Sequence, residues 1–214
     1  MNFMALNILV TGGNGRLCTE LKKVLPARYV DIQDYDLAGP HIPKGKYDLI
    51  IHAAAYTDVK RAEEEHLACF RDNVHGTSNL VRVYLDTPFI YISTEYANKP
   101  LGWYARTKRA GEEIVKTHPH HLIVRTSFKP NPWPFPFAYE NQYTQGDYVD
   151  VIAKGLADLA LKWNREDSAL VYLGTGRKTI LELAQRTQPD VKPNRVEDYN
   201  KQLGVELVPT DYLD

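Results

Sequence analysis

The chain has little of what marks several common protein classes. Its 214 residues include only two cysteines, Cys18 and Cys69, which excludes a disulfide scaffold and a cysteine-rich zinc module and favours a reducing compartment. Lysine and arginine (26) nearly balance aspartate and glutamate (27), so no charge excess attracts nucleic acid or an anionic membrane. The strongest apolar run, residues 49–55, is interrupted by His52 and is much shorter than the roughly 20 residues of a membrane span. The first residues also lack the charged segment and the cleavage pattern of a signal peptide. We therefore expect a cytoplasmic protein with no nucleic-acid or membrane partner.

What the chain does have is an alternation of short apolar runs and helical patterns. The apolar runs predict buried strands at 7–11, 29–32, 48–53, 89–92 and 122–124. Apolar residues at helical spacing predict helices at 15–25, 60–86 and 103–116. Strands that alternate with helices form a parallel sheet through right-handed crossovers, with helices on both faces. We therefore predict an α/β fold over residues 1–127, a doubly wound parallel sheet of the Rossmann type.

The composition changes after Ser127. Residues 129–137 form a stiff loop of prolines and aromatic residues. Patterns further on predict a helix near 149–163, a strand at 169–173, a helix at 179–187 and a tail of sparse pattern at 189–214. We predict that 128–214 form a small, shortened C-terminal lobe on the substrate side, partly packed back onto the Rossmann core. Three roles stay open for the loop's aromatic residues: an apolar wall for a sugar or base, an interface, or simple packing. These residues are Trp133, Phe135 and Phe137.

A glycine-rich turn, residues 11–18, connects the first predicted strand to the first helix. The pyrophosphate of a dinucleotide needs a close approach to the backbone and the N–H groups at a helix start. Gly12 permits the turn and Gly15 permits the approach. Cys18 stands where a third glycine usually lets the helix pack close to the strand. The turn therefore predicts a dinucleotide site in which Cys18 replaces the third glycine of the usual pattern.

An acidic residue at the end of the second strand supports this prediction. Asp31 follows Gly12 by 19 residues, close to the spacing of an acceptor for a ribose hydroxyl. Asp34 and Asp36 are the competing candidates. The Asp31 carboxylate favours NAD, because it would face the 2′-phosphate of NADP, whereas the Arg16 guanidinium would favour a phosphate. The choice between NAD and NADP stays open.

A tyrosine and a lysine lie one helical turn apart in the third predicted helix. Tyr104 and Lys108 share one helix face, and a cation beside a phenol lowers the pKa of that phenol. A tyrosine that exchanges protons near neutral pH needs such help, since its ordinary pKa is about 10. Thr94, at the end of the fourth strand, would hold the same substrate oxygen. These three residues predict a proton-transfer site.

Together these motifs resemble the extended short-chain dehydrogenase/reductases, in their dTDP-4-dehydrorhamnose reductase-like (RmlD-like) branch. The matching stretches cover nearly the whole chain and lie at 8–15, 52–57, 73–80, 92–96, 125–127, 148–153 and 172–180. The resemblance implies that Tyr104 is the general acid, that Lys108 holds the nicotinamide ribose and tunes Tyr104, and that Thr94 positions the carbonyl. It also implies that Asn73 is a structural asparagine beneath the site. The residues that it assigns to NAD or NADP are Gly12, Asn14, Gly15, Arg16, Leu17, Asp31, Ala53, Ala54, Ala55, Asn73, Tyr104 and Lys108.

The resemblance implies an NAD(P)-dependent oxidoreductase that reduces a keto group of a nucleotide sugar, with a homodimer as a candidate assembly. Two departures affect the substrate side: only nine residues separate Thr94 from Tyr104, and the region after Ser127 is short. A cofactor-sensing regulatory subunit of the same fold is one alternative. A nucleotide-sugar epimerase or dehydratase is the other, although Glu95 stands alone where dehydratases usually carry an aspartate–glutamate pair. We expect no metal site, because the histidines at 118–121 have no cysteine or carboxylate beside them.

Overall fold

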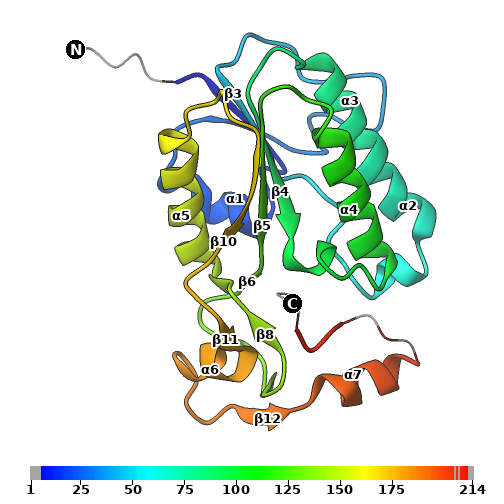
Figure 1. Ribbon diagram of the computed structural model, residues 1–214, viewed down its shortest axis with the longest axis vertical. Coiled ribbons are helices and arrows are strands. Elements are labelled where there is room, and N and C mark those ends of the chain that lie inside the picture. Colours follow the sequence, from blue (N-terminus) through cyan, green and yellow to red (C-terminus); the bar gives the residue numbers. More distant parts are fainter. Residues whose placement is uncertain (1–5, 205, 207, 212–214) are drawn as a thin grey trace.

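The computed structural model describes residues 6–204, 206 and 208–211. Its centre is a six-stranded sheet in the order β10-β5-β4-β3-β1-β2, in which all neighbouring strands are parallel (Figure 1). The strands are β1 (Ile8–Thr11), β2 (Arg28–Val30), β3 (Leu49–His52), β4 (Phe89–Thr94), β5 (His121–Thr126) and β10 (Ala169–Leu173). The strand order reverses beside β1, and such a reversal leaves a crevice beyond the carboxyl ends of the strands.

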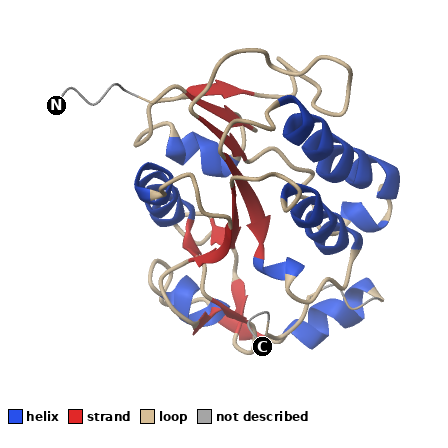
Figure 2. Ribbon diagram, turned by 45° about the horizontal axis from the view of Figure 1, so that its top comes forward, coloured by secondary structure: helices blue, strands red, loops and turns tan. Residues whose placement is uncertain are grey.

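Helices cover both faces of this sheet (Figure 2). Successive side chains of a strand point to opposite faces. Ile8 and Val10 of β1 therefore pack with α1 (Arg16–Leu21) and α5 (Val149–Lys162), whereas Leu9 packs with the helices of the other face. Those helices are α2 (His66–Phe70), α3 (Gly76–Val83) and α4 (Trp103–Val115). The predicted doubly wound α/β fold is confirmed.

The helical region predicted at 60–86 is divided into several elements. The segment contains a short 3-10 turn, η1 (Arg61–Glu63), then α2, a π-helix, η2 (Arg71–His75), and α3. The π-helix carries Asn73, whose side chain hydrogen-bonds both backbone polar groups of Tyr56. A widened helical turn is frequent at functional sites. Here it lies directly under the loop that follows β3.

The chain after residue 127 is divided between the main sheet and a smaller lobe. α5 and β10 belong to the main sheet and its cover. The lobe holds, among the described residues, three two-stranded sheets and two helices. They are formed by β6 (Phe128–Lys129) with β9 (Asp147–Tyr148), β7 (Phe137–Tyr139) with β12 (Lys192–Asn194), β8 (Tyr143–Thr144) with β11 (Lys178–Thr179), α6 (Ile180–Gln185) and α7 (Val196–Leu203). The domain boundary at residue 127 stays a prediction.

Of the three aromatic residues of the proline-rich loop, only Trp133 is packed in a core. Trp133 is only 6% exposed and lies in the core of the lobe with Ile180, Leu183 and Val191. Phe135 and Phe137 are largely exposed. In the part of the chain that the structure describes, none of the helices is long and apolar enough to cross a membrane.

Candidate active site

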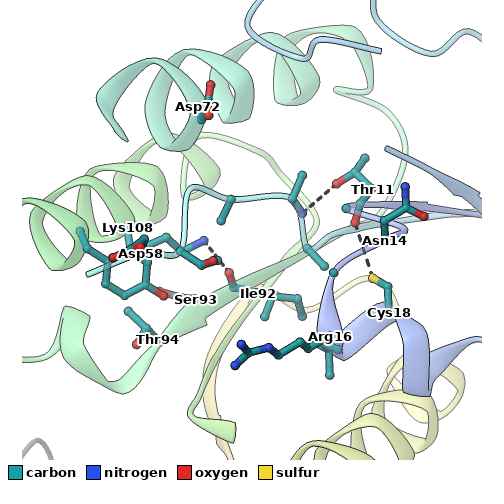
Figure 3. A pocket seen from close by; sticks show the side chains of 18 of the residues that line it. Thr11, Asn14, Arg16, Cys18, Asp58, Asp72, Ile92, Ser93, Thr94 and Lys108 are labelled. Atoms are coloured by element: carbon teal, nitrogen blue, oxygen red, sulfur yellow. Dashed lines mark hydrogen bonds between the residues drawn. The ribbon is translucent and has the colours of Figure 1, made fainter. Parts of the chain in front are cut away.

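A cavity of about 910 Å³ lies beyond the carboxyl ends of the sheet strands (Figure 3). Its lining comes from the glycine turn, from the segments after β2, β3, β4 and β5, from α4 and from α7. Apart from Asn73, every residue that the sequence assigns to the cofactor or to catalysis lines it. The structure therefore brings two predicted sites into one cavity. The glycine turn and Asp31 form its cofactor end, and Thr94, Tyr104 and Lys108 form its chemical end.

The glycine turn is pressed against the loop that follows β3. Gly12 has a φ of +76°, and a Cβ there would stand 2.7 Å from the backbone nitrogen of Ala54. A side chain at this position is excluded both by conformation and by contact. Cys18 is buried, and its Sγ donates to the Thr11 carbonyl at 3.8 Å. Burial raises the pKa of Cys18 to about 12, so this residue is a packing element between α1 and β1.

Asp31 is tied directly to the glycine turn. One carboxylate oxygen accepts the backbone N–H of Asn14 at 2.7 Å, and the other accepts the N–H of Ile32 at 2.8 Å. Asp34 receives the N–H of Asp31 and does not line the cavity. Asp36 lines the cavity but is ion-paired with Arg71. Of the three acidic candidates, Asp31 is the one that is not neutralised by a cation and faces the space beside the turn.

Arg16 extends away from this acidic end. Figure 3 shows its side chain pointing from the glycine turn toward the part of the cavity that holds Thr94, while Asn14 lies on the other side. A guanidinium in that position serves the middle of the cavity rather than the space beside Asp31.

Lys108 is buried below the floor of the cavity's other end. Its Nζ donates to the Ile92 carbonyl at 2.7 Å and lies 4.1 Å from the centre of the Tyr91 ring. Burial lowers the pKa of Lys108 to about 7, and the nearby charge of Glu112 partly opposes this. The ammonium is thus directed toward β4.

Tyr104 does not have the lowered pKa that the tyrosine–lysine spacing predicts. Burial raises the pKa of its phenol, and the opposing influence is a hydrogen bond with the side chain of Thr94. The Lys108 ammonium donates to the Ile92 carbonyl instead. Tyr104 is therefore a protonated phenol at neutral pH, linked to the hydroxyl with which it was predicted to act.

A buried ion pair that the sequence pattern does not reveal supports this end of the cavity. Arg125 of β5 donates to both carboxylate oxygens of Glu112 in α4, at 2.8 and 2.7 Å. Ser93, the neighbour of Thr94, donates to the same carboxylate at 2.6 Å. The end of β4 is in this way fixed to the helix that carries Tyr104 and Lys108.

Asn73 lies beneath the cavity and connects its floor to α4. Its Oδ1 accepts from the Tyr56 N–H at 2.8 Å, and its Nδ2 donates to the Tyr56 carbonyl and to Thr107 Oγ1, at 3.2 and 3.0 Å. Asn73 does not line the cavity, and its hydrogen bonds make it a support beneath the floor. The cofactor contact assigned to it stays a prediction.

Glu95 has no capacity left for chemistry. It is buried, and its carboxylate accepts from Thr144 Oγ1 at 2.6 Å and from the backbone N–H groups of Gln145 and Gly146, at 2.9 and 3.1 Å. These hydrogen bonds connect the lobe to Glu95, which directly follows Thr94 in the chain. This occupation removes the acid–base group that a dehydratase would need at this position.

The model of the RmlD substrate binding domain family matches residues 6–154, which is more than half of the chain. The chain belongs to this family. The chain is also similar to a dTDP-4-dehydrorhamnose reductase of Mycolicibacterium smegmatis, 29% identical over 156 residues, which cover 60% of this chain and 47% of that protein. The same enzyme of Aggregatibacter actinomycetemcomitans is 30% identical over 149 residues, covering 56% of this chain and 51% of that protein. The matched part of the chain thus spans about half the length of these relatives.

Solved structures of the same kind share the fold. The dTDP-4-dehydrorhamnose reductase of Bacillus anthracis, in complex with NADP, superposes with a TM-score of 0.78 at 20% identity and covers 99% of this chain and 96% of that one. An orthologue from Clostridium acetobutylicum gives 0.75 at 22% identity, covering 91% and 85%. The family thus has the predicted architecture, and the resemblance seen in the sequence is confirmed.

Proposed function

We propose that this family member is an NAD(P)-dependent reductase of a keto group on a nucleotide sugar, of the dTDP-4-dehydrorhamnose reductase type. The observation that carries the proposal is the shared cavity: the glycine turn and Asp31 lie at one end, and Thr94, Tyr104 and Lys108 at the other. Relatives of this name, one of them complexed with NADP, support it. Both cysteines are free and buried, which fits a reaction in the cytoplasm.

The residues present fit a bound dinucleotide. Gly12 and the alanines after β3 leave the floor free of large side chains, and Asp31 offers a carboxylate to a ribose hydroxyl. When bound, the nicotinamide supplies the hydride. Lys108, at the chemical end, would hold the ribose next to that ring.

The chain's own part in the reaction is proton delivery. The raised pKa of Tyr104 keeps its phenol protonated, so it can donate to the carbonyl oxygen as that oxygen becomes an alkoxide. Thr94 hydrogen-bonds the phenol and would orient the same carbonyl oxygen.

A panel of keto sugars linked to dTDP, UDP and GDP tests the proposal, with NADH or NADPH oxidation followed by absorbance. We expect oxidation with at least one dTDP-linked 4-keto sugar and its loss in Tyr104→Phe. Absence of turnover with every substrate would reject the proposal. Retention of NAD through purification would instead favour an epimerase.

A cofactor-binding regulatory subunit is the second candidate, favoured by the short segment of nine residues between Thr94 and Tyr104. It predicts tight NAD(P) binding with no consumption of NADH or NADPH in the same panel.

A further inference from the structure

The C-terminal helix α7 contacts the loop that follows β3. Val59 of this loop, Tyr96 and Tyr199 all pack against a small buried cluster formed by Val196 and Val208. Figure 1 shows α7 below α2 and α4, at the end of the molecule opposite to α3. Residues far apart in the sequence therefore meet at one end of the cavity.

Two polar side chains of this contact line the cavity, and each keeps hydrogen-bonding capacity that no described residue takes up. Among the described residues, nothing hydrogen-bonds the hydroxyl of the half-buried Tyr199. Asp58 accepts the Arg61 N–H at 3.0 Å through Oδ1, and within the described part of the chain its Oδ2 has no partner. Burial raises the pKa of Tyr199, with smaller contributions from Tyr96 and from the Asp58 carboxylate. The site thus offers a protonated phenol as a donor and a free carboxylate oxygen as an acceptor.

This pair lies at the chemical end of the cavity. Tyr96, which belongs to the same apolar cluster as Tyr199, has its ring centre 6.2 Å from that of Tyr104, at an angle of 81°. Figure 3 places Asp58 on the side of the cavity that holds Thr94 and Lys108, away from Asn14. The unused polar groups are therefore near the proton donor and far from the predicted ribose acceptor, Asp31.

We propose that Asp58 and Tyr199 form a subsite for the ring hydroxyls of the substrate's sugar. The inference rests on the proposed function and adds to it the residues that select the sugar. A carboxylate accepts hydrogen bonds from sugar hydroxyls, and such charge-assisted bonds are the strong ones. A tyrosine adds an apolar ring face for the C–H groups of a pyranose and a hydroxyl for its polar edge. The sugar ring that carries the carbonyl would then be held next to Thr94 and Tyr104.

Calorimetry with NAD⁺ present tests the subsite, with dTDP-rhamnose as the probe and dTDP alone as its reference. Asp58→Asn keeps an oxygen for the Arg61 N–H but loses the charge, and Tyr199→Phe loses only a hydroxyl. We expect the affinity for dTDP-rhamnose to fall roughly ten- to hundredfold in Asp58→Asn and roughly two- to tenfold in Tyr199→Phe. The affinity for dTDP should not change in either. Asp190→Asn, an exposed aspartate outside the cavity, is the matched control.

The outcomes separate the subsite from the proposed function. If the wild type binds dTDP-rhamnose and reduces the keto sugar but both variants bind like the wild type, the subsite is overturned and the reductase stands. If the variants lose dTDP and dTDP-rhamnose affinity alike, the residues serve the nucleotide and the subsite is again overturned. A wild type that neither binds dTDP-rhamnose nor turns over rejects the function and the subsite together. Thermal unfolding of each variant confirms that it is folded, and each variant tests the subsite by itself.

Discussion

Replacing Glu112 by glutamine removes one charge from the buried ion pair without changing the volume. Glu112 is 0% exposed, and Arg125 is 4% exposed. Removing one partner of a buried pair leaves the other charge uncompensated and costs about 3–5 kcal/mol. Arg125 retains hydrogen bonds to Asn98 and to the Tyr172 hydroxyl, each at 3.0 Å. We therefore expect the lower end, a loss of about 3 kcal/mol in the free energy of unfolding.

Urea denaturation measures this loss, and a double-mutant cycle with Arg125→Met assigns it to the pair. For a chain of this size, about 3 kcal/mol corresponds to a fall of about 6–12 °C in the melting temperature. The double variant should recover part of the loss, with a coupling energy of about 2 kcal/mol or more. A loss below about 1 kcal/mol in Glu112→Gln at an unchanged denaturant slope would refute the reasoning. Purely additive single effects would show that the two side chains do not act as a pair.

Three further predictions concern the site. Tyr104→Phe should lower turnover by about a hundred- to ten-thousandfold with little change in the Kd of the cofactor, and equal turnover would remove Tyr104 as the acid. Asp31→Ala should weaken NADH more than NADPH in calorimetry, because a ribose acceptor is lost while repulsion of the 2′-phosphate is relieved; equal losses would mean that Asp31 acts only through the Asn14 N–H. Since the pKa of Lys108 falls from 10.5 to about 7 on folding, the unfolded chain holds more protons between these values, and stability should rise with pH across this window. Lys108→Met should lose that rise, and parallel stability curves for the two proteins would contradict it.

The sequence was sufficient for the sheet and for residues at both ends of the cavity. Strands of a parallel sheet are buried on both faces and therefore read as continuous apolar runs, as in residues 7–11 and 122–124. The glycine turn and Asp31 could be placed because each follows such a run directly. These features depend on neighbours in the sequence, so no tertiary contact was needed to recognise them.

The missed features depend on contacts between distant residues. Strands of two or three residues, such as β6 and β8, are too short to show a period. α7 buries only Val196, so its apolar pattern is weak. Glu112 and Arg125 are ordinary charged residues in the sequence, and the pairing of β4 with β5 is what brings Arg125 beside Ser93. The lowered pKa expected for Tyr104 failed for the same reason, since the spacing of Tyr104 and Lys108 does not show that Ile92 holds the ammonium.

The hydrogen bonds between Glu95 and the lobe limit which chimeric proteins can be made by exchanging the lobe with that of a relative. Glu95 is covalently next to Thr94, yet its three hydrogen bonds all come from residues 144–146. Gly146 is pressed so closely to the backbone after β5 that a Cβ would stand 2.0 Å from the Ser127 carbonyl oxygen. A chimera with a foreign lobe must therefore keep Glu95, Ser127 and the 144–146 turn from one parent. A crossover point between them would leave a buried carboxylate without donors beside the residue that orients the substrate.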